Sequence, residues 1–473
     1  MGKNSCPLLF EFNLMCFSLF YLITTFSLML YTSFSNHNDI NFNADHRHYP
    51  GDNLRLFTYP AIYGEQKHAV STSISSCNSP LFFPDYRKAY DEIYGLCGSN
   101  GSNSPPSPVL RYMQRPEADG DDFQDTTFAG NLSMEKRKTF FNLGNFSDDF
   151  SSVEIPCGFL KEFPVDQSDI KSMEECRSVV VASAIFGDYD KIRQPKGLGY
   201  LTLTKVCFYM FIDSSTLVAL KAQGIHVSKS ENRSGTIGVW RIIVVGGGSI
   251  PMPYDNAAMN GVIPKHLIHR LFPNSRYSVW VDGKLQLTVD PLLLVHSLLQ
   301  VRPLPHHSSI FDMAVSKHPL NKHTMEEAVS TARWGKWPHL DGLRLQMEAY
   351  CRNGLTPWSS EKSPYTTDVP DTALIVRKHG LRSNLFSCLL FNELEGFNPR
   401  DQLAFAYIRD LMFPKIGVHM FEVETFEQIA IEYRHNLVHI PAKYKPSRTE
   451  RRRASSRGIN GNNSCHHYLL HMW

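Results

Sequence analysis

Between residues 155 and 440, short apolar and β-rich runs alternate with segments whose apolar residues recur at helical spacing. The runs predict strands at 178–186, 206–213, 240–245, 277–289, 312–317 and 372–378. The helical spacing predicts helices at 264–272, 324 onwards, 341–351 and 400–410. Strands that alternate with helices predict an α/β fold with a mainly parallel central sheet and helices on both faces.

Two helix starts carry capping signals. Thr324 followed three residues later by Glu327 has the pattern of a capping box. Asn398 before Pro399 has the pattern of an N-cap followed by proline at the first helical position. We therefore expect helices to begin at Thr324 and Pro399.

Residues 12–34 form an uncharged apolar run near the amino terminus. A helix needs about 20 such residues to cross a membrane, and a cleaved signal peptide has a shorter apolar core that ends in small residues. The run predicts an uncleaved signal-anchor, with residues 1–11 cytosolic and the rest lumenal. The expected location is the Golgi membrane, single-pass type II, with the endoplasmic reticulum as the alternative.

Composition divides the rest of the chain. Residues 35–154, with the linker-like stretch 98–108, are expected to form a partly disordered lumenal stem. The net charge of +2 hides an uneven distribution, because from Lys443 to the end seven Lys/Arg stand against Glu450 alone, giving +6 there and −4 elsewhere. We expect 441–473 to be a basic disordered tail. Because the remaining chain is mildly acidic, nucleic acid is not an expected partner.

Sequons and cysteines agree with a lumenal body. The expected glycosylation sites are Asn100, Asn131, Asn145 and Asn232, and a further sequon lies at Asn462. The cysteines form no C-x-x-C pair, which argues against a structural zinc site. Disulfides could join Cys77 to Cys97 and Cys157 to Cys176, whereas Cys207 and Cys388, inside apolar runs, are read as buried thiols.

Acidic residues follow two predicted strands. Asp188 and Asp190 come after the strand at 178–186, and Asp213 ends the strand at 206–213. Ligands of open α/β sheets bind beyond the carboxyl ends of the strands, so these carboxylates are candidate nucleotide contacts. The alternative is that they are ordinary turn residues.

The segment Trp280-Val281-Asp282-Gly283-Lys284 follows a third strand. It resembles the D-x-D position at which GT-A glycosyltransferases hold Mn²⁺ or Mg²⁺ against the diphosphate of a nucleotide sugar. Lys284 replaces the second aspartate and could neutralise a phosphate without metal. The alternative is a type I′ hairpin turn at Asp282-Gly283.

Three further groups are candidates. Asp401, at a helix start, could be a base, a metal ligand or an acceptor clamp, or only a favourable charge near a helix N-terminus. Glu393 and Glu395 could do acid–base work or lie on an exposed loop. His266 and His269, three residues apart on a predicted helix, could share a metal.

Four blocks, 183–198, 269–291, 367–380 and 384–407, resemble a plant-rich family with a glycosyltransferase-like domain. Its members carry two labels, a mucilage-related hexosyltransferase and a turgor-regulation alkaline ceramidase. The resemblance implies a GT-A-like domain at 155–440 that transfers a hexose from a nucleotide sugar to a glycan or lipid acceptor. Asp282 and Lys284 would face the diphosphate, Asp188, Asp190 and Asp213 the nucleotide, and Asp401 the acceptor.

Two alternatives remain open. The ceramidase label implies hydrolysis of the ceramide amide to sphingosine and fatty acid, with water activated through His266 and His269. The third possibility is a non-catalytic sugar-binding module, because the D-x-D pattern is incomplete.

Overall fold

The computed structural model describes residues 21–26, 83–98, 110–113, 132–145, 153–158, 163–225, 227–230, 233–246, 252–299, 311–333, 335–435 and 465. Residues 58–473 form one compact unit and residues 1–57 another. In the latter, residues 21–26 are helical, and the rest of the predicted span at 12–34 lies outside the described residues. None of the described helices is both long and apolar enough to span a bilayer. The tail at 441–473 also lies outside the description, apart from Cys465.

A nine-stranded sheet forms the centre of the larger unit. Its strands, in spatial order, are β12 (Val418–Phe421), β10 (Met313–Lys317), β11 (Pro370–Lys378), β8 (Tyr277–Val281), β3 (Val179–Ile185), β4 (Cys207–Asp213), β7 (Trp240–Val245), β6 (Arg233–Ile237) and β5 (Ser228–Ser230). The inner strands β8, β3, β4 and β7 are parallel, as is the pair β10–β12.

The expectation of a mainly parallel sheet is wrong in part. β11 runs antiparallel to both β10 and β8. At the other end of the sheet, β6 pairs antiparallel with both β5 and β7. β11 begins beside the last residue of β10, since Pro370 pairs with Lys317. β11 therefore runs in the direction opposite to β10. The result is a mixed sheet in an α/β fold.

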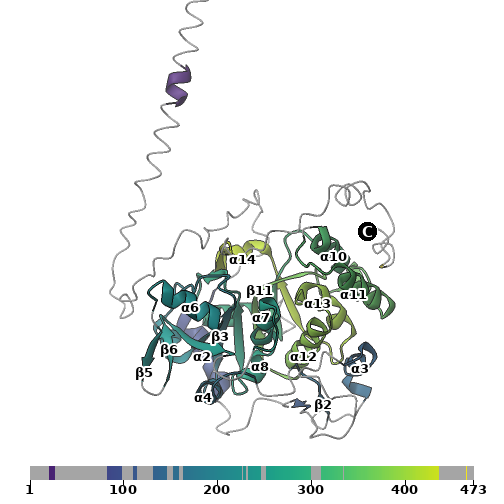
Figure 1. The fold of residues 1–473 in the computed structure, drawn as a ribbon, viewed down its shortest axis with the longest axis horizontal. Coiled ribbons are helices and arrows are strands. Elements are labelled where there is room, and N and C mark those ends of the chain that lie inside the picture. The colour runs from purple at the N-terminus through teal and green to yellow at the C-terminus, as the bar shows by residue number, and fades with distance from the viewer. Residues whose placement is uncertain are drawn as a thin grey trace, which may run out of the picture. The chain divides into compact units, whose positions relative to one another are not determined.

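Both faces of the sheet are buried. Along β3, Val180 and Ala182 belong to a core shared with α7 (Ala257–His266), α12 (Leu381–Gly396) and α13 (Asp401–Leu411), which lie in front of the sheet in Figure 1. Val179 and Val181 alternate with them and are equally buried. Helix α9 (Pro291–Leu299) packs on β8, β10, β11 and β12. The prediction of helices on both faces is confirmed.

The remaining elements surround this core. They are α4 (Gln167–Glu174), α5 (Tyr200–Lys205), α6 (Ser214–Ala222), α8 (Ile268–Leu271), α10 (Thr324–Arg333), α11 (Leu340–Arg352), η6 (Ser360–Lys362) and α14 (Val423–Ile429). A short antiparallel pair joins β13 (Ala430–Glu432) to β9 (Leu285–Leu287). The predicted helix at 264–272 is divided between α7 and α8 at Leu267.

Segments from the predicted stem contact the domain. These are α2 (Tyr86–Gly98), β1 (Arg111–Tyr112), which pairs with β2 (Glu154–Ile155), α3 (Met134–Thr139) and η4 (Leu143–Asn145). The Tyr86 hydroxyl lies 2.9 Å from Thr202 Oγ1, and α2 packs on α9. Arg137 on α3 forms a buried ion pair with Glu393 on α12 at 2.7 Å. Parts of the stem region are therefore built into the same body.

Helix α10 begins at Thr324 as predicted, but its predicted capping contact is wrong, and the start of α13 differs from the prediction. Glu326, not Glu327, reaches back to the His323 N–H at 3.1 Å, while Glu327 is fully buried. Helix α13 begins at Asp401 rather than at Pro399, because Asn398 Oδ1 instead accepts the Arg400 N–H in a turn before the helix.

Among the described residues, three disulfides join cysteines that are distant in sequence: Cys157–Cys388, Cys176–Cys207 and Cys351–Cys465. The predicted Cys157–Cys176 pair is wrong, as is the interpretation of Cys207 and Cys388 as free thiols. Cys388 faces Cys157 because α12 packs beside the segment that follows β2, a contact that sequence spacing does not reveal. Cys77 and the side chain of Cys97 lie outside the described part.

Candidate functional site

The turn after β8 places Asp282 at the carboxyl edge of the sheet. The Asp282 carbonyl accepts the Leu285 N–H at 2.8 Å, but β9 then leaves the sheet and pairs with β13. The predicted type I′ hairpin is therefore wrong. Gly283 is required because a Cβ there would lie 2.9 Å from the Ala184 carbonyl oxygen at the end of β3.

The Asp282 carboxylate is held from two sides. Its Oδ1 accepts the Trp280 Nε1–H at 2.7 Å and lies 3.4 Å from Lys265 Nζ. The side chain is 28% exposed, so it remains open to a ligand from solvent. The fold thus offers a fixed, accessible carboxylate where ligands of α/β sheets bind.

Lys265 on α7 is a buried ammonium group between two carboxylates. Its Nζ lies 2.9 Å from Asp401 Oδ2, 3.4 Å from Asp282 Oδ1 and 3.2 Å from Thr372 Oγ1. Burial opposes the charge, but Asp282 and Asp401 outweigh it and raise the Lys265 pKa. Lys265 therefore stays cationic and joins the two acidic candidates into one site.

Asp401 opens α13 and is buried. His266 Nε2 lies 3.2 Å from its Oδ2, and His266 Nδ1 faces Arg377 Nη2 at 3.4 Å. Because Arg377 can only donate, Nδ1 is the acceptor and Nε2–H donates to Asp401. Burial would raise the Asp401 pKa, but Lys265 and His266 hold it well below the usual range. Burial lowers the His266 pKa to about 4, so this imidazole is neutral at pH 7.

A second layer of charges lies beside the turn. Lys284 Nζ pairs with Glu432 Oε1 at 2.9 Å. Burial opposes the Lys284 charge, but Glu432, Asp371 and Asp282 raise its pKa. Asp190 Oδ1 accepts from His435 Nδ1 at 2.8 Å, and this hydrogen bond raises the His435 pKa. Residues 430–435, which follow α14, therefore contact the turns at the carboxyl ends of β3 and β8.

Asp213 and Asp188 have local structural contacts. Asp213 Oδ1 caps α6 through the Thr216 N–H at 2.8 Å, and its Oδ2 accepts the Gly187 N–H at 2.9 Å. Asp188 adopts a left-handed backbone (φ 53°), and its N–H donates to Thr216 Oγ1. Both residues fix the loop that carries Asp190.

The charged residues around the Asp282 turn form one cluster: Asp190, Lys265, His266, Asp282, Lys284, Asp371, Arg377, Asp401, Glu432 and His435. Other candidates lie apart from this cluster. His269 contacts the sulfurs of the Cys157–Cys388 disulfide, whereas His266 contacts Asp401, so the two histidines have different partners. Glu393 is buried in α12 against Arg137 and the Tyr350 hydroxyl, and the exposed-loop interpretation is wrong. Asn145 ends η4, while Asn100, Asn131, Asn232 and Asn462 lie outside the described residues.

The sequence interpretation missed five members of the cluster: Lys265, Asp371, Arg377, Glu432 and His435. Lys265 had one available signal, a lysine within a helical stretch otherwise rich in apolar residues. Glu432 and His435 had none, because only the return of β13 to β9 brings them to the turn.

The excess of carboxylates in the cluster fits the binding of a divalent cation. Carboxylates outnumber the permanent cations: Asp190, Asp282, Asp371, Asp401 and Glu432 face Lys265, Lys284 and Arg377. Mg²⁺ typically binds one or two protein carboxylates together with substrate phosphates. The partly exposed Asp282 carboxylate, whose contacts with Trp280 and Lys265 both fall on Oδ1, fits that role, with Asp190 across Gly283 as the second oxygen donor.

Comparisons with known proteins agree on one family, whose named members carry different activities. The family description "TOD1/MUCI70, glycosyltransferase-like domain" matches residues 110–435. "Alkaline ceramidase TOD1" of Arabidopsis thaliana is 50% identical over 99% of this chain and 98% of its own length. "Probable hexosyltransferase MUCI70" of the same plant is 32% identical over 78% of this chain and 60% of its own length. The crystal structure of apo mouse xyloside xylosyltransferase 1 aligns with 52% of this chain and 85% of that chain, at 8% identity and a TM-score of 0.29.

Proposed function

The chain belongs to the TOD1/MUCI70 family of proteins with a glycosyltransferase-like domain, and from this premise we propose that it transfers a hexosyl group from a nucleotide sugar to an acceptor. One observation carries the proposal. Asp282, Lys265 and Lys284 lie together at the carboxyl edge of the sheet, where the partly exposed Asp282 carboxylate and Lys284 ammonium group can face a diphosphate.

The proposed roles follow from exposure and charge. Lys284 is 22% exposed and is the ammonium group placed to stabilise the negative charge that develops on the leaving diphosphate. Lys265 is nearly buried, and its ion pair with Asp282 holds that carboxylate in position from the interior side. The Asp190 loop lies on the nucleotide side, beside Gly283.

Asp401 is better suited to positioning than to proton transfer. Its carboxylate is buried, holds two partners and has a pKa far below neutral, so it is a weak base. We assign it the role of orienting Lys265 through the 2.9 Å ion pair. This replaces the acceptor-side role expected from the sequence.

The proposal includes Mn²⁺ or Mg²⁺, held by Asp282 and Asp190 together with the donor phosphates. When bound, such an ion supplies positive charge to the diphosphate oxygens. The chain's own residues then keep the carboxylates in place: Trp280 and Lys265 fix Asp282, and His435 fixes Asp190. We also propose a single-pass Golgi location, from residues 12–34.

A second candidate function is ceramide amide hydrolysis. It is favoured by the 50% identity, over nearly the full length, to a relative named alkaline ceramidase. Hydrolysis needs a water activated by a base or a metal. The neutral His266 lies in the same cluster but is completely buried, which leaves it without access to a lipid amide.

One experiment separates the two. Purified full-length protein is titrated with nucleoside diphosphates, with and without Mn²⁺, and is assayed in parallel for sphingosine release from ceramide. We expect nucleotide binding that Asp282→Asn abolishes and that the exposed control Asp341→Asn retains. Sphingosine release that requires Asp282, without nucleotide binding, would establish the second function instead.

A further inference from the structure

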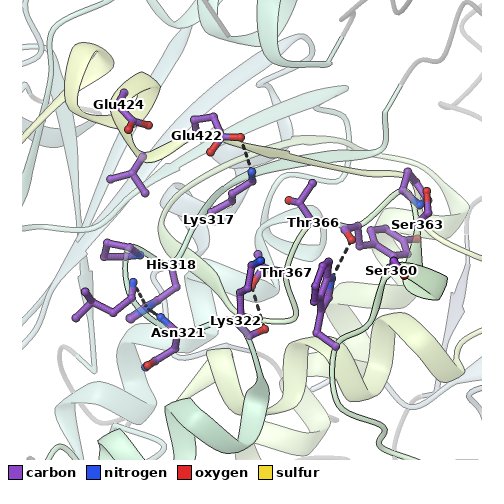
Figure 2. Close-up of a pocket in the computed structure, with 16 residues that line it drawn as sticks. Lys317, His318, Asn321, Lys322, Ser360, Ser363, Thr366, Thr367, Glu422 and Glu424 are labelled. Atoms are coloured by element: carbon purple, nitrogen blue, oxygen red, sulfur yellow. Dashed lines mark hydrogen bonds and ion pairs between the residues drawn. The ribbon is translucent and has the colours of Figure 1, made fainter. Parts of the chain in front are cut away.

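A cavity of about 690 Å³ opens beside the cluster, on the same edge of the sheet. β10 runs in the same direction as β8, because each is antiparallel to β11 between them. Lys317 at the end of β10 and Asp282 after β8 therefore lie at one edge. Glu422, after the parallel strand β12, forms an ion pair with Lys317 on the cavity wall (Figure 2).

Asp371, near the start of β11, connects the cavity with the cluster. Its charge acts on Lys265 and Lys284 on one side and on His318, a cavity residue, on the other. The cavity and the cluster are thus neighbouring parts of one surface. A molecule in the cavity would lie close to the donor bound at Asp282.

The lining combines fixed aromatic rings with hydroxyl groups. The Trp358 Nε1–H donates to the Tyr365 carbonyl at 3.0 Å, and the Tyr365 hydroxyl donates to the Ile416 carbonyl at 2.7 Å. Both rings are half-buried, while Ser360, Ser363 and Thr366 are exposed. Lys322 Nζ lies 4.5 Å from the centre of the Trp358 ring. Fixed aromatic surfaces beside polar groups suit the apolar faces and hydroxyl groups of sugar rings.

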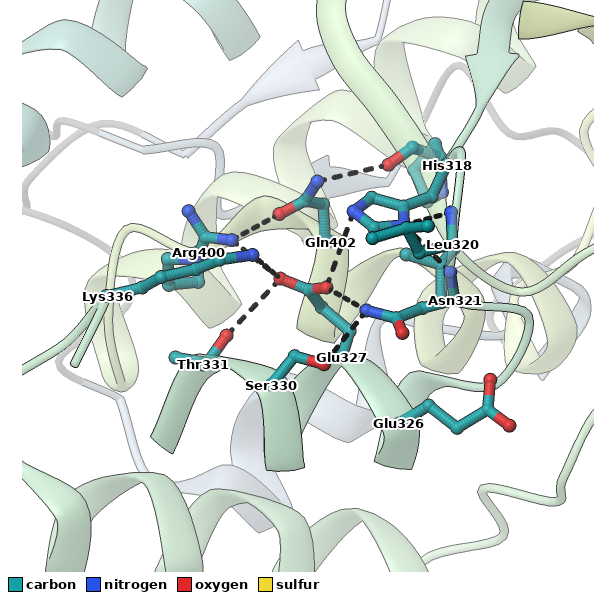
Figure 3. Close-up of polar contacts among 12 residues, drawn as sticks. His318, Leu320, Asn321, Glu326, Glu327, Ser330, Thr331, Lys336, Arg400 and Gln402 are labelled. Carbon is teal, nitrogen blue, oxygen red and sulfur yellow. Dashed lines mark hydrogen bonds and ion pairs between the residues drawn. The ribbon is translucent and has the colours of Figure 1, made fainter. Parts of the chain in front are cut away.

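A buried network holds the wall opposite these rings. Glu327, with no exposed surface, accepts from Arg400 at 2.7 Å, Lys336 at 3.1 Å and Asn321 at 2.6 Å (Figure 3). His318 Nδ1 accepts the Asn321 N–H at 2.9 Å. The wall is therefore formed before any ligand arrives, which lowers the entropy lost on binding.

We infer that this cavity is the acceptor subsite and that the acceptor is a glycan rather than a lipid. The inference rests on the proposed hexosyl transfer. An acyl chain needs a continuous apolar lining, whereas in this cavity charged groups and hydroxyls interrupt the apolar and aromatic side chains. The volume is within the range of pockets that enclose a ligand of a few sugar units.

The test measures glycan binding apart from catalysis. Full-length protein is titrated calorimetrically with a panel of short neutral and uronate-containing oligosaccharides, and separately with nucleoside diphosphate. For the glycan that binds, we expect Trp358→Ala to weaken affinity at least about tenfold. The half-buried Trp337 lies outside the cavity, so Trp337→Ala is the matched control and should bind normally. Thr366→Val, a nearly isosteric change at an exposed position, should weaken binding several-fold if Trp358→Ala does not fold.

The outcomes separate the two proposals. Glycan binding that depends on Trp358 and survives Asp282→Asn supports the subsite, even if nucleotide binding fails and the transferase proposal falls with it. Nucleotide binding without glycan binding, or glycan binding unaffected by both cavity variants, overturns the subsite alone. Ceramide vesicles that compete with the glycan for the cavity would overturn the assignment of a glycan acceptor.

Discussion

Lys265 Nζ lies 2.9 Å from Asp401 Oδ2, and both side chains are at least nine-tenths buried. A buried ion pair contributes little net stability by itself, because desolvation offsets the attraction. Removing one partner is different, since it leaves an uncompensated charge in the interior. The pair is therefore a sensitive point of the fold as well as the support of Asp282.

Asp401→Asn should reduce the free energy of unfolding by about 3–5 kcal/mol, because it leaves the Lys265 ammonium with the more distant Asp282. Chemical denaturation of the full-length protein measures this. The exposed pair Arg344–Glu348 provides the control, and Glu348→Gln should change stability by less than about 0.5 kcal/mol. Equal effects of the two substitutions would contradict a structural role for Asp401.

Lys284→Met should lower kcat for hexosyl transfer by about a hundredfold, with a smaller effect on acceptor KM, because the lost ammonium would act on the leaving group. Steady-state kinetics with the sugar nucleotide and the glycan selected by the binding experiments measure both constants. Lys171 is exposed on α4, and Lys171→Met should leave them unchanged. An unchanged kcat in Lys284→Met would remove Lys284 from the mechanism.

His266 should make the protein less stable in acid. Its folded pKa is lowered by burial from 6.5 to about 4, so the neutral imidazole supports the fold fully above pH 6.5. That support is lost as pH falls from 6.5 towards 4, where the unfolded chain binds the proton more readily. In His266→Gln, whose amide can still donate to Asp401, stability should change less across this window.

Unfolding midpoints measured at intervals between pH 7 and pH 4 test this prediction. The exposed His339 supplies the control, and His339→Gln should keep the acid slope of the parent protein. If His266→Gln also keeps that slope, His266 is not a source of the acid sensitivity.

The Cys157–Cys388 disulfide closes a loop across most of the domain, with a sequence separation of 231 residues. Its removal should reduce stability by about 2–5 kcal/mol, because the unfolded chain regains the freedom that the link removes. Replacing both cysteines by alanine and measuring unfolding tests this. Peptide mapping without reduction should recover all three pairs, and a Cys157–Cys176 peptide would contradict the structure.

Glu327→Gln should destabilise the protein by about 3–5 kcal/mol, because Arg400 and Lys336 would face each other across a neutral group. The neighbouring Glu326 accepts the Lys322 and His323 N–H groups at the start of α10, and because a glutamine oxygen can still accept them, Glu326→Gln should cost no more than about 1 kcal/mol. Glycan affinity should fall in the first variant only, if the network holds the cavity wall as inferred.

Local patterns predicted much of the fold. The runs at 178–186, 206–213 and 240–245 are β3, β4 and β7, because a strand buried on both faces shows as a continuous apolar run. The turn at Asp282 was also predictable as a feature after a strand. The direction of β11 was not, since one apolar run fits either orientation in a sheet.

The sequence by itself determined most of the central strands and several of the helices, the acidic residues at the strand ends and, through resemblance, the family. Only the tertiary structure decided which charges meet. His266 and Asp401 are 135 residues apart and touch because α7 and α13 pack on the same face of the sheet. It likewise decided that Glu393 is buried and that Cys388 pairs with Cys157. Periodicity reports which face of an element is buried, whereas ion pairs and disulfides depend on what packs against that face.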